Sequence, residues 1–253
     1  MRVAALYDIH SNLPALEAVV EEIHRDPVDR IVVGGDVFPG PFPRETIKRL
    51  TSLDIPLQFI KGNADREVHE RMLGRESDSV PERFREAVRW AAMELNPDYA
   101  EMIASWPQTL RLEITGIGKT LFCHATPRND TEVFTRLTPE DKLLPVLKGV
   151  DSVLVVCGHT HMQFDRTIGR IRVVNAGSVG MPYGEPGAHW LLLGPGVQHK
   201  VTSYDLEKAA ANIRESRYPL AQDFARNVVQ PPTLEEMLKV FGQAELEWNT
   251  SGP

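Results

Sequence analysis

The chain has 253 residues, and its 42% hydrophobic and 25% charged content is that of a globular protein with room for one large domain or two small ones. Its net charge of −7 argues against a surface that coats nucleic acid, and no segment approaches the roughly 18 apolar residues of a membrane span. The N-terminal apolar run is too short for a secretory signal. Cys123 and Cys157 each end an apolar run, which is typical of buried reduced thiols. We therefore expect a cytoplasmic protein without disulfides.

The first part of the chain alternates short apolar strands with amphipathic helices. Strands are predicted over residues 3–7, 31–33 and 57–60, and helices are predicted to begin near Pro14 and Pro43. Each strand ends in glycine or polar residues. This order of strand, loop and helix is typical of an α/β fold, in which ligands bind at the carboxyl ends of the strands.

The middle of the chain departs from this alternation. Residues 66–106 are predicted to be a helical insertion or cap beside the site. After it, the pattern predicts strands over residues 110–114 and 120–123, a helix over 139–147, and a buried strand over 153–157.

The rest of the chain is predicted to hold two hairpins and three helices. They cover residues 164–174, 189–204, 206–215, 219–227 and a last helix opened by a capping box of Thr233 and Glu236. We therefore expect one α/β domain over residues 1–204 and a helical C-terminal extension, residues 205–253, packed on the same domain.

Seven side chains of the metal-binding type stand at the ends of five predicted strands. They are Asp8 and His10, Asp36, Asn63, His124, and His159 with His161. Their carboxylate, imidazole and amide groups suit Mn²⁺, Fe²⁺, Ni²⁺ or Zn²⁺. Seven donors are too many for one ion that leaves room for a substrate, whereas two ions that share a bridging carboxylate use them all. Asp36 lies at the centre of the set, and two such ions activate water and neutralise charge in phosphoryl chemistry.

The histidine pair follows Gly158 at the end of a predicted strand. Alternate residues of an extended segment point to opposite sides, so the two rings need not bind the same ion. We expect His159 and His161 to serve different metals, one on each side of Asp36.

The combined pattern resembles the calcineurin-like metallophosphoesterase superfamily over roughly residues 1–204. It consists of Asp8-Ile9-His10, Gly35-Asp36, Gly62-Asn63, His124 and Gly158-His159-Thr160-His161, in the family's order and placement. The compact bacterial and archaeal branch with Gly-Asn-x-Asp in place of Gly-Asn-His is the most similar. The resemblance implies a four-layer αββα sandwich of two mixed β-sheets, with the helical insertion and the helical tail added to it.

The resemblance also implies a ligand set and an activity. One ion is held by Asp8, His10, Asp36 and His161, and the other by Asp36, Asn63, His124 and His159. With Asp36 and Asn63 at the catalytic centre, a metal-activated hydroxide then hydrolyses a P–O bond of a small soluble phosphorylated substrate.

One position departs from the family pattern. Many members carry a histidine after the asparagine, which protonates the leaving group, whereas this chain has Ala64 followed by Asp65. We expect Asp65 to orient a metal ligand, or to cap the next segment, rather than to act as an acid. A missing acid is most costly for poor leaving groups, so we expect a phosphodiesterase or an enzyme of nucleotide-like substrates.

Two further residues have both a functional and a structural interpretation. The amide of Asn12 can cap the first helix or contact a substrate phosphate, and Arg128 can clamp a phosphate or lie solvated on the surface. The turn over residues 175–178 can support the site or only connect two strands.

Other functions remain as alternatives. Within the enzyme class these are a serine/threonine-type protein phosphatase and a dinucleoside-polyphosphate hydrolase. A metal-binding scaffold protein, like the retromer subunit of this fold, is less consistent with seven intact donors. A nuclease is less consistent with an acidic chain that has no basic stripe and no dedicated nucleic-acid surface.

Overall fold

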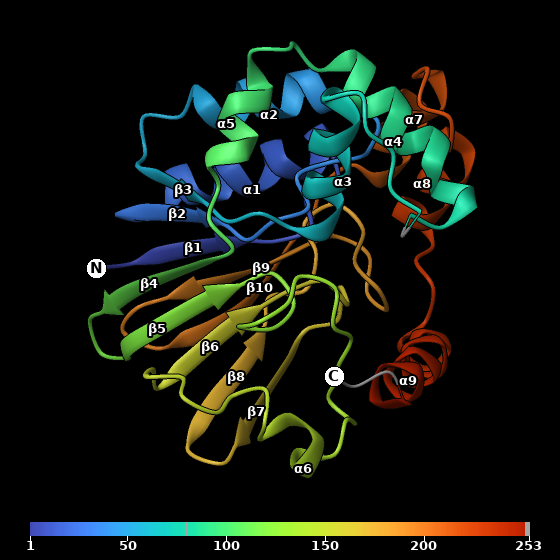
Figure 1. The fold of residues 1–253 in the computed structure, drawn as a ribbon. Coiled ribbons are helices and arrows are strands. Elements are labelled where there is room, and N and C mark those ends of the chain that lie inside the picture. The colour runs from blue at the N-terminus through green and yellow to red at the C-terminus, as the bar shows by residue number, and fades with distance from the viewer. Residues whose placement is uncertain (79, 251–253) are drawn as a thin grey trace.

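Two β-sheets pack face to face, with helices on the outside of the sandwich (Figure 1). The computed structural model describes residues 1–78 and 80–250, and for residues 244–250 only the backbone. The end of the predicted C-terminal extension, residues 251–253, lies outside the described residues. Each sheet has five strands and is mixed, so the predicted fold class is confirmed.

The first sheet has the strand order β10-β9-β1-β2-β3. Its strands are β1 (Val3–Leu6), β2 (Arg30–Val33), β3 (Leu57–Phe59), β9 (Ala188–Leu193) and β10 (Val197–Thr202). The strands β1, β2 and β3 run parallel, so their carboxyl ends meet at one edge, while β9 and β10 are antiparallel to their neighbours. Helices α1 (Leu13–Arg25) and α2 (Pro43–Thr51) cover its outer face.

The second sheet has the order β4-β5-β6-β8-β7. Its strands are β4 (Thr109–Ile114), β5 (Gly118–Cys123), β6 (Leu154–Cys157), β7 (Phe164–Ile168) and β8 (Ile171–Asn175). The three inner strands, β5, β6 and β8, are parallel. The helix predicted over residues 139–147 is wrong in length, because α6 covers only Glu140–Leu143. Pro145 explains the early end, since it has no N–H to continue the helical hydrogen bonds.

The strand β1 is buried on both faces. Val3, Ala5 and Tyr7 point between the sheets, where they pack against residues such as Phe122, while Ala4 and Leu6 pack under the helices. This explains why β1 is a continuous apolar run rather than an alternating one. The two layers of core hold the ends of β1 and β6 in fixed positions, and the functional loops start there.

The remaining helices lie above the first sheet and down the right side of the sandwich as drawn in Figure 1. They are α3 (Asn63–Met72), α4 (Glu82–Glu94), α5 (Tyr99–Ser105), α7 (Leu206–Glu215), α8 (Ala221–Val229) and α9 (Leu234–Thr250). The predicted capping box of α9 is confirmed, because Thr233 N–H donates to Glu236 (2.9 Å) and Glu236 N–H donates to Thr233 Oγ1 (3.3 Å). None of the described helices combines the length and the apolar composition needed to cross a bilayer.

Candidate metal centre

The seven predicted donors converge at the carboxyl ends of strands from both sheets. The first sheet supplies Asp8 and His10 after β1, Asp36 after β2 and Asn63 after β3, and the second supplies His124 after β5 and His159 with His161 after β6. Six of them form two groups that could each hold a metal ion: Asp8 with His10 and His161, and Asp36 with His124 and His159. His159 and His161 therefore lie in different groups.

The backbone of these loops is left-handed at several non-glycine residues. Among the described residues, positive φ angles outside glycine occur at Asp8 (52°), His10 (45°), Ser11 (49°), Asp36 (51°), His159 (66°) and His161 (56°). Each such residue costs of order 1–3 kcal/mol, which the surrounding sandwich must offset. The separation of the two histidine rings thus comes from this left-handed backbone and not from the extended alternation that the sequence predicts.

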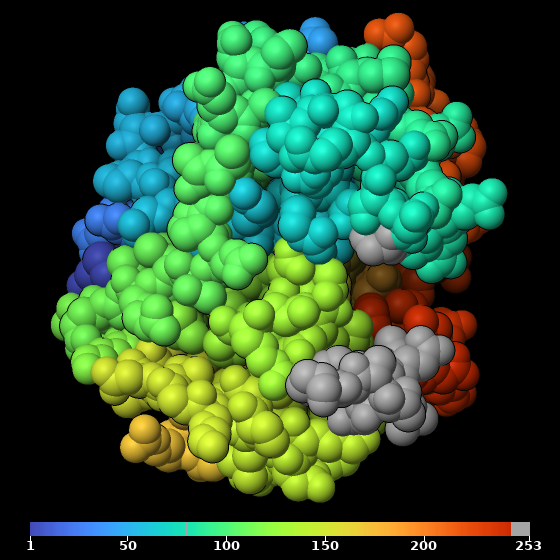
Figure 2. Space-filling model, viewed as in Figure 1, coloured from blue at the N-terminus to red at the C-terminus, as the bar shows by residue number. Residues whose placement is uncertain are grey.

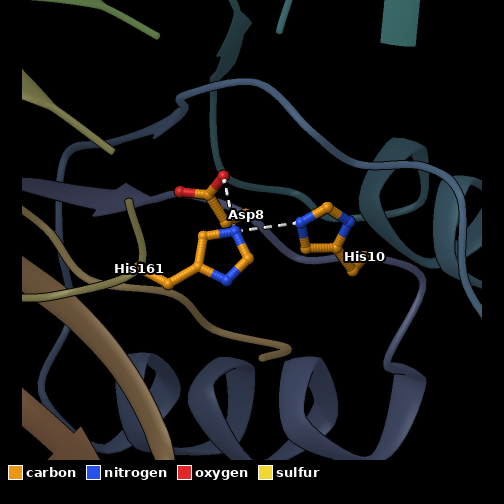
Figure 3. A group of neighbouring side chains, drawn as sticks. All are labelled: Asp8, His10 and His161. Carbon is orange, nitrogen blue, oxygen red and sulfur yellow. Dashed lines mark hydrogen bonds and ion pairs between the residues drawn. The ribbon is translucent and has the colours of Figure 1, made fainter. Parts of the chain in front are cut away.

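The first group consists of Asp8, His10 and His161 (Figure 3). His161 Nε2 lies 3.3 Å from Asp8 Oδ1 and 3.2 Å from His10 Nε2. Asp8 Oδ1 is buried and has no hydrogen-bond partner among the described residues, whereas Oδ2 accepts the His159 N–H (2.9 Å). A buried carboxylate oxygen without a partner is costly, so this point of the structure favours a bound cation.

Two backbone carbonyls set the proton positions of the histidine rings. His161 Nδ1 is 2.7 Å from Met181 O, and His124 Nδ1 is 3.0 Å from Gly34 O. Because a carbonyl only accepts, each Nδ1 carries the proton and donates it. The Nε2 atom of each ring then faces the carboxylates. It can hold a second proton there, which the carboxylates favour, or give its lone pair to a metal ion when the ring is neutral.

The second group surrounds Asp36. Its Oδ2 lies 3.4 Å from His124 Nε2 and 4.0 Å from His10 Nε2, so this oxygen stands between the two groups. Asn63 Oδ1 is 3.1 Å from His124 Nε2, with the two atoms facing each other. An amide oxygen and an imidazole lone pair repel each other unless a cation lies between them or the amide is turned so that its NH₂ group donates. A cation bound between Asn63 and His124 would therefore explain why Oδ1 faces the ring.

The charges of the site are arranged as a metal would need them. Burial lowers the pKa of His10 and of His159 to about 4, so both rings are neutral at pH 7. Burial opposes ionisation of Asp36, but the neighbouring imidazoles, His124 foremost, outweigh it and hold its pKa below the ordinary value. Burial likewise disfavours a charged His124, yet the charge of Asp36 raises its pKa to about 10. A divalent ion compensates the same buried carboxylates, so the donor set fits one.

Two glycines allow the backbone to approach the carboxylates. A Cβ atom on Gly158 would lie 2.4 Å from Asp8 Oδ2, and one on Gly62 would lie 2.1 Å from Asp36 Oδ1. Both distances are shorter than any non-bonded contact, so larger residues cannot stand there without displacing a ligand.

Asp65 connects the loops that carry Asp36 and Asn63. Its Oδ1 accepts the Phe38 N–H and its Oδ2 accepts the Gly62 N–H, each at 3.1 Å, which also caps α3. The side chain is fully buried, and burial together with the charge of Asp36 raises its pKa to about 7. Both oxygens are directed at backbone donors.

Asn12 is held as a helix cap in the structure. This residue is completely buried, its Oδ1 accepts the Ala15 N–H (3.3 Å) as the cap of α1, and its Nδ2 donates to Gly180 O (2.9 Å). The capping alternative is therefore confirmed. Arg128 is docked on the buried Glu132, with Nε 2.8 Å from Oε1, so a role as phosphate clamp requires it to leave or share this partner.

Several supporting residues were missed or only suspected from the sequence. In the turn after β8, Ser178 Oγ donates to Asp8 O (2.7 Å) and Asn175 Nδ2 donates to Gly158 O (2.7 Å). The Tyr183 ring stacks on His161, with centroids 5.3 Å apart and planes inclined by 20°. The polar type of Asn175 and Ser178 at a strand end is a usable signal, whereas nothing in the sequence pairs Tyr183 with His161.

Comparisons of the sequence with known proteins found one matching family and one curated relative. A family model described as the calcineurin-like phosphoesterase superfamily domain matches residues 1–194. An uncharacterized protein of Methanocaldococcus jannaschii is 27% identical over 238 residues, which cover 86% of this chain and 93% of that protein.

Two solved structures show the same fold. A hypothetical protein of Pyrococcus horikoshii superposes with a TM-score of 0.77 at 19% identity, over 92% of this chain and 99% of that one. A metallophosphoesterase of Sphaerobacter thermophilus superposes with a TM-score of 0.68 at 24% identity, over 91% and 99% of the two chains.

Proposed function

Because the chain belongs to the calcineurin-like phosphoesterase superfamily, it is a metal-dependent phosphoric ester hydrolase, and we propose that it is a dinuclear phosphodiesterase of a small soluble substrate. One observation carries the dinuclear part of the proposal. Asp36 Oδ2 lies 3.4 Å from a histidine of one group and 4.0 Å from a histidine of the other, as a bridging ligand requires.

The proposed ligands divide between two ions. Asp8, His10, Asp36 and His161 would hold the first, and Asp36, Asn63, His124 and His159 the second. The mixture of imidazole and oxygen donors suits Mn²⁺, Fe²⁺, Ni²⁺ or Zn²⁺. When bound, the ions supply a water of lowered pKa and neutralise the charge that develops on the phosphoryl oxygens.

The residues of the chain prepare this chemistry in advance. His10 and His159 are neutral at pH 7 and present lone pairs, and Met181 O fixes the orientation of the His161 ring. Because these groups are already oriented, little reorganisation is needed when charge develops during the reaction.

The proposed preference for diesters rests on residues 64 and 65. The methyl group of Ala64 has no proton to give, and both oxygens of Asp65 are occupied by backbone N–H groups. Neither residue can protonate a departing alkoxide. Leaving groups that depart without protonation, such as those of activated diesters and of nucleotide-like substrates, suit this site best.

Two further proposals follow from the same observations. We place residues 1–204 in the catalytic domain and residues 205–253 in an extension packed on it. The proposal is supported by a hydrophobic cluster that Ala210 and Phe224 share with Ala87 of α4. A cytoplasmic location is consistent with Cys123 and Cys157, which are buried free thiols.

The test compares a diester, a monoester and nucleotides in the presence of Mn²⁺, Ni²⁺ or Mg²⁺. We expect metal-dependent hydrolysis of bis-p-nitrophenyl phosphate to exceed that of p-nitrophenyl phosphate, and Asp36→Asn to abolish it. Asp165→Asn is the matched control, because Asp165 of β7 pairs with Arg172 of β8 and lies outside both groups. Full activity of Asp36→Asn would refute the bridging role, and a purified protein that shows no metal-dependent hydrolysis of these esters would favour the scaffold alternative.

A further inference from the structure

One aromatic side chain lies between the metal centre and the C-terminal helix α9. The Tyr183 ring stacks on His161 at 5.3 Å, and the Tyr183 N–H donates to His161 O (3.4 Å). The same ring contacts Phe241 of α9, with centroids 6.2 Å apart and planes inclined by 52°. A proposed metal ligand is thus connected to α9 through a single residue.

A second contact fixes the start of α9 on the same loop. Gly184 N–H donates to Pro232 O (2.9 Å), two residues before α9 begins. Gly184 has a φ of +85°, and a Cβ atom there would lie 2.8 Å from Leu234 Cγ. The loop after β8 and the first turn of α9 are therefore in close contact.

The position of α9 in the molecule agrees with this connection. In Figure 2, α9 (red) borders a recess whose other borders are the α3–α4 segment (cyan) and the segment after β5 (yellow-green). The helix also lies beyond residues 1–194, to which the family model is matched.

The His161 ring needs a contact of this kind. Met181 O holds one edge of the ring through Nδ1, but a single hydrogen bond leaves the ring free to tilt about that edge. A flat neighbour inclined by only 20° restricts this tilt. Tyr183 has no ring contact with His124 or His159 among the described residues, so its effect should be confined to one ion.

We propose that Tyr183 is a positioning residue that fixes the plane of His161 for the ion held with Asp8 and His10, and that α9 supports this ion through Phe241. The proposal rests on the ligand set given under the proposed function. It makes the C-terminal helix a determinant of metal affinity at one of the two groups.

The experiment titrates Mn²⁺ into the full-length protein after chelation and records each binding step by calorimetry. His10→Ala and His159→Ala identify which step belongs to which group. We expect Tyr183→Leu to weaken only the step that depends on His10, by about 10-fold, as is typical when the residue that supports a metal ligand is removed. Tyr183→Phe keeps the ring and should bind as the unaltered protein does. Phe241→Ala should weaken the same step by a smaller factor than Tyr183→Leu does, because Phe241 acts through Tyr183.

Tyr218→Leu is the matched control, since Tyr218 packs on Trp90 and Phe224 away from the centre. It should lower the melting temperature and leave both steps unchanged. If Tyr183→Leu changes neither step, or weakens both equally, Tyr183 does not position His161. If Phe241→Ala has no effect, α9 has no part in binding, and this variant remains informative where Tyr183→Leu fails to fold. If the unaltered protein has no step that depends on His10, the ligand set itself is wrong.

Discussion

Replacing Asp65 by asparagine tests how the loops of Asp36 and Asn63 are held together. Asp65 is fully buried, and its two oxygens accept the N–H groups of Phe38 and Gly62 at 3.1 Å each. Asparagine keeps one acceptor oxygen and turns an NH₂ group toward the other backbone donor. A buried donor without a partner costs about 1–3 kcal/mol. At a pH where Asp65 is protonated, the free energy of unfolding of the variant should therefore be lower than that of the original protein by this amount.

The negative charge of ionised Asp65 has the opposite effect on this comparison, because it destabilises the original protein and is absent from the variant. Burial and the charge of Asp36 raise the pKa of Asp65 from 3.8 to about 7. Because the folded-state pKa is above that of the unfolded chain, the stability that protonated Asp65 contributes is complete below pH 4 and is lost as the pH rises to about 7. Asparagine does not titrate. As the pH rises from 5 to 8, the free energy of unfolding of the variant should therefore increase by about 3 kcal/mol relative to that of the original protein.

The assay is urea unfolding of both proteins at pH 5 and pH 8, in the presence of a chelator. A second series with saturating Mn²⁺ should show a smaller pH-dependent difference, because nearby cations favour the ionised carboxylate. If the difference in unfolding free energy between the two proteins is the same at both pH values, the buried carboxyl does not have the raised pKa on which this reasoning rests.

Three other changes have outcomes that the structure specifies. Chelation should lower the melting temperature measured by calorimetry. Mn²⁺ at 100 times its Kd should restore about 2.7 kcal/mol of unfolding free energy per ion, or about 5–10 °C for a chain of this size. An unchanged melting temperature would contradict a metal centre. Gly158→Ala should weaken binding at the group of Asp8 by more than about 10-fold and cost about 1–3 kcal/mol, because the new Cβ lies 2.4 Å from Asp8 Oδ2; unaltered Mn²⁺ titration would argue otherwise. Trp106→Ala should cost about 3–5 kcal/mol in urea unfolding, because the buried ring stacks on Phe59 (4.7 Å) and Phe38 (6.4 Å), and a loss below about 1 kcal/mol would not fit this packing.

The parts of the molecule that the sequence predicts are those with a local signal. An apolar run that ends in Asp8 or in Gly158 specifies both a buried strand and a polar loop at its carboxyl end. Since parallel strands bring these ends to one edge, the convergence of the donors follows from the same pattern. The capping box of Thr233 and Glu236 is equally local, because both partners lie within one turn.

The parts that the sequence does not predict depend on residues distant along the chain or on the main chain itself. Met181 O and Gly34 O set the proton positions of His161 and His124, and any residue type would supply the same carbonyl. The burial of Asn12 under Gly180 depends on a loop more than a hundred residues away. The left-handed backbone at the donors also leaves no trace in the choice of side chain.

Each candidate metal group takes ligands from both sheets. Asp8 and His10 follow strands of the first sheet and His161 follows one of the second, and Asp36 likewise faces His124 and His159 across the interface. An ion in either group would form a reversible crosslink between the two sheets. Two crosslinks side by side would also oppose rotation of one sheet on the other. Removing the metals should therefore loosen the contact between layers before it disturbs the hydrogen bonds within either sheet.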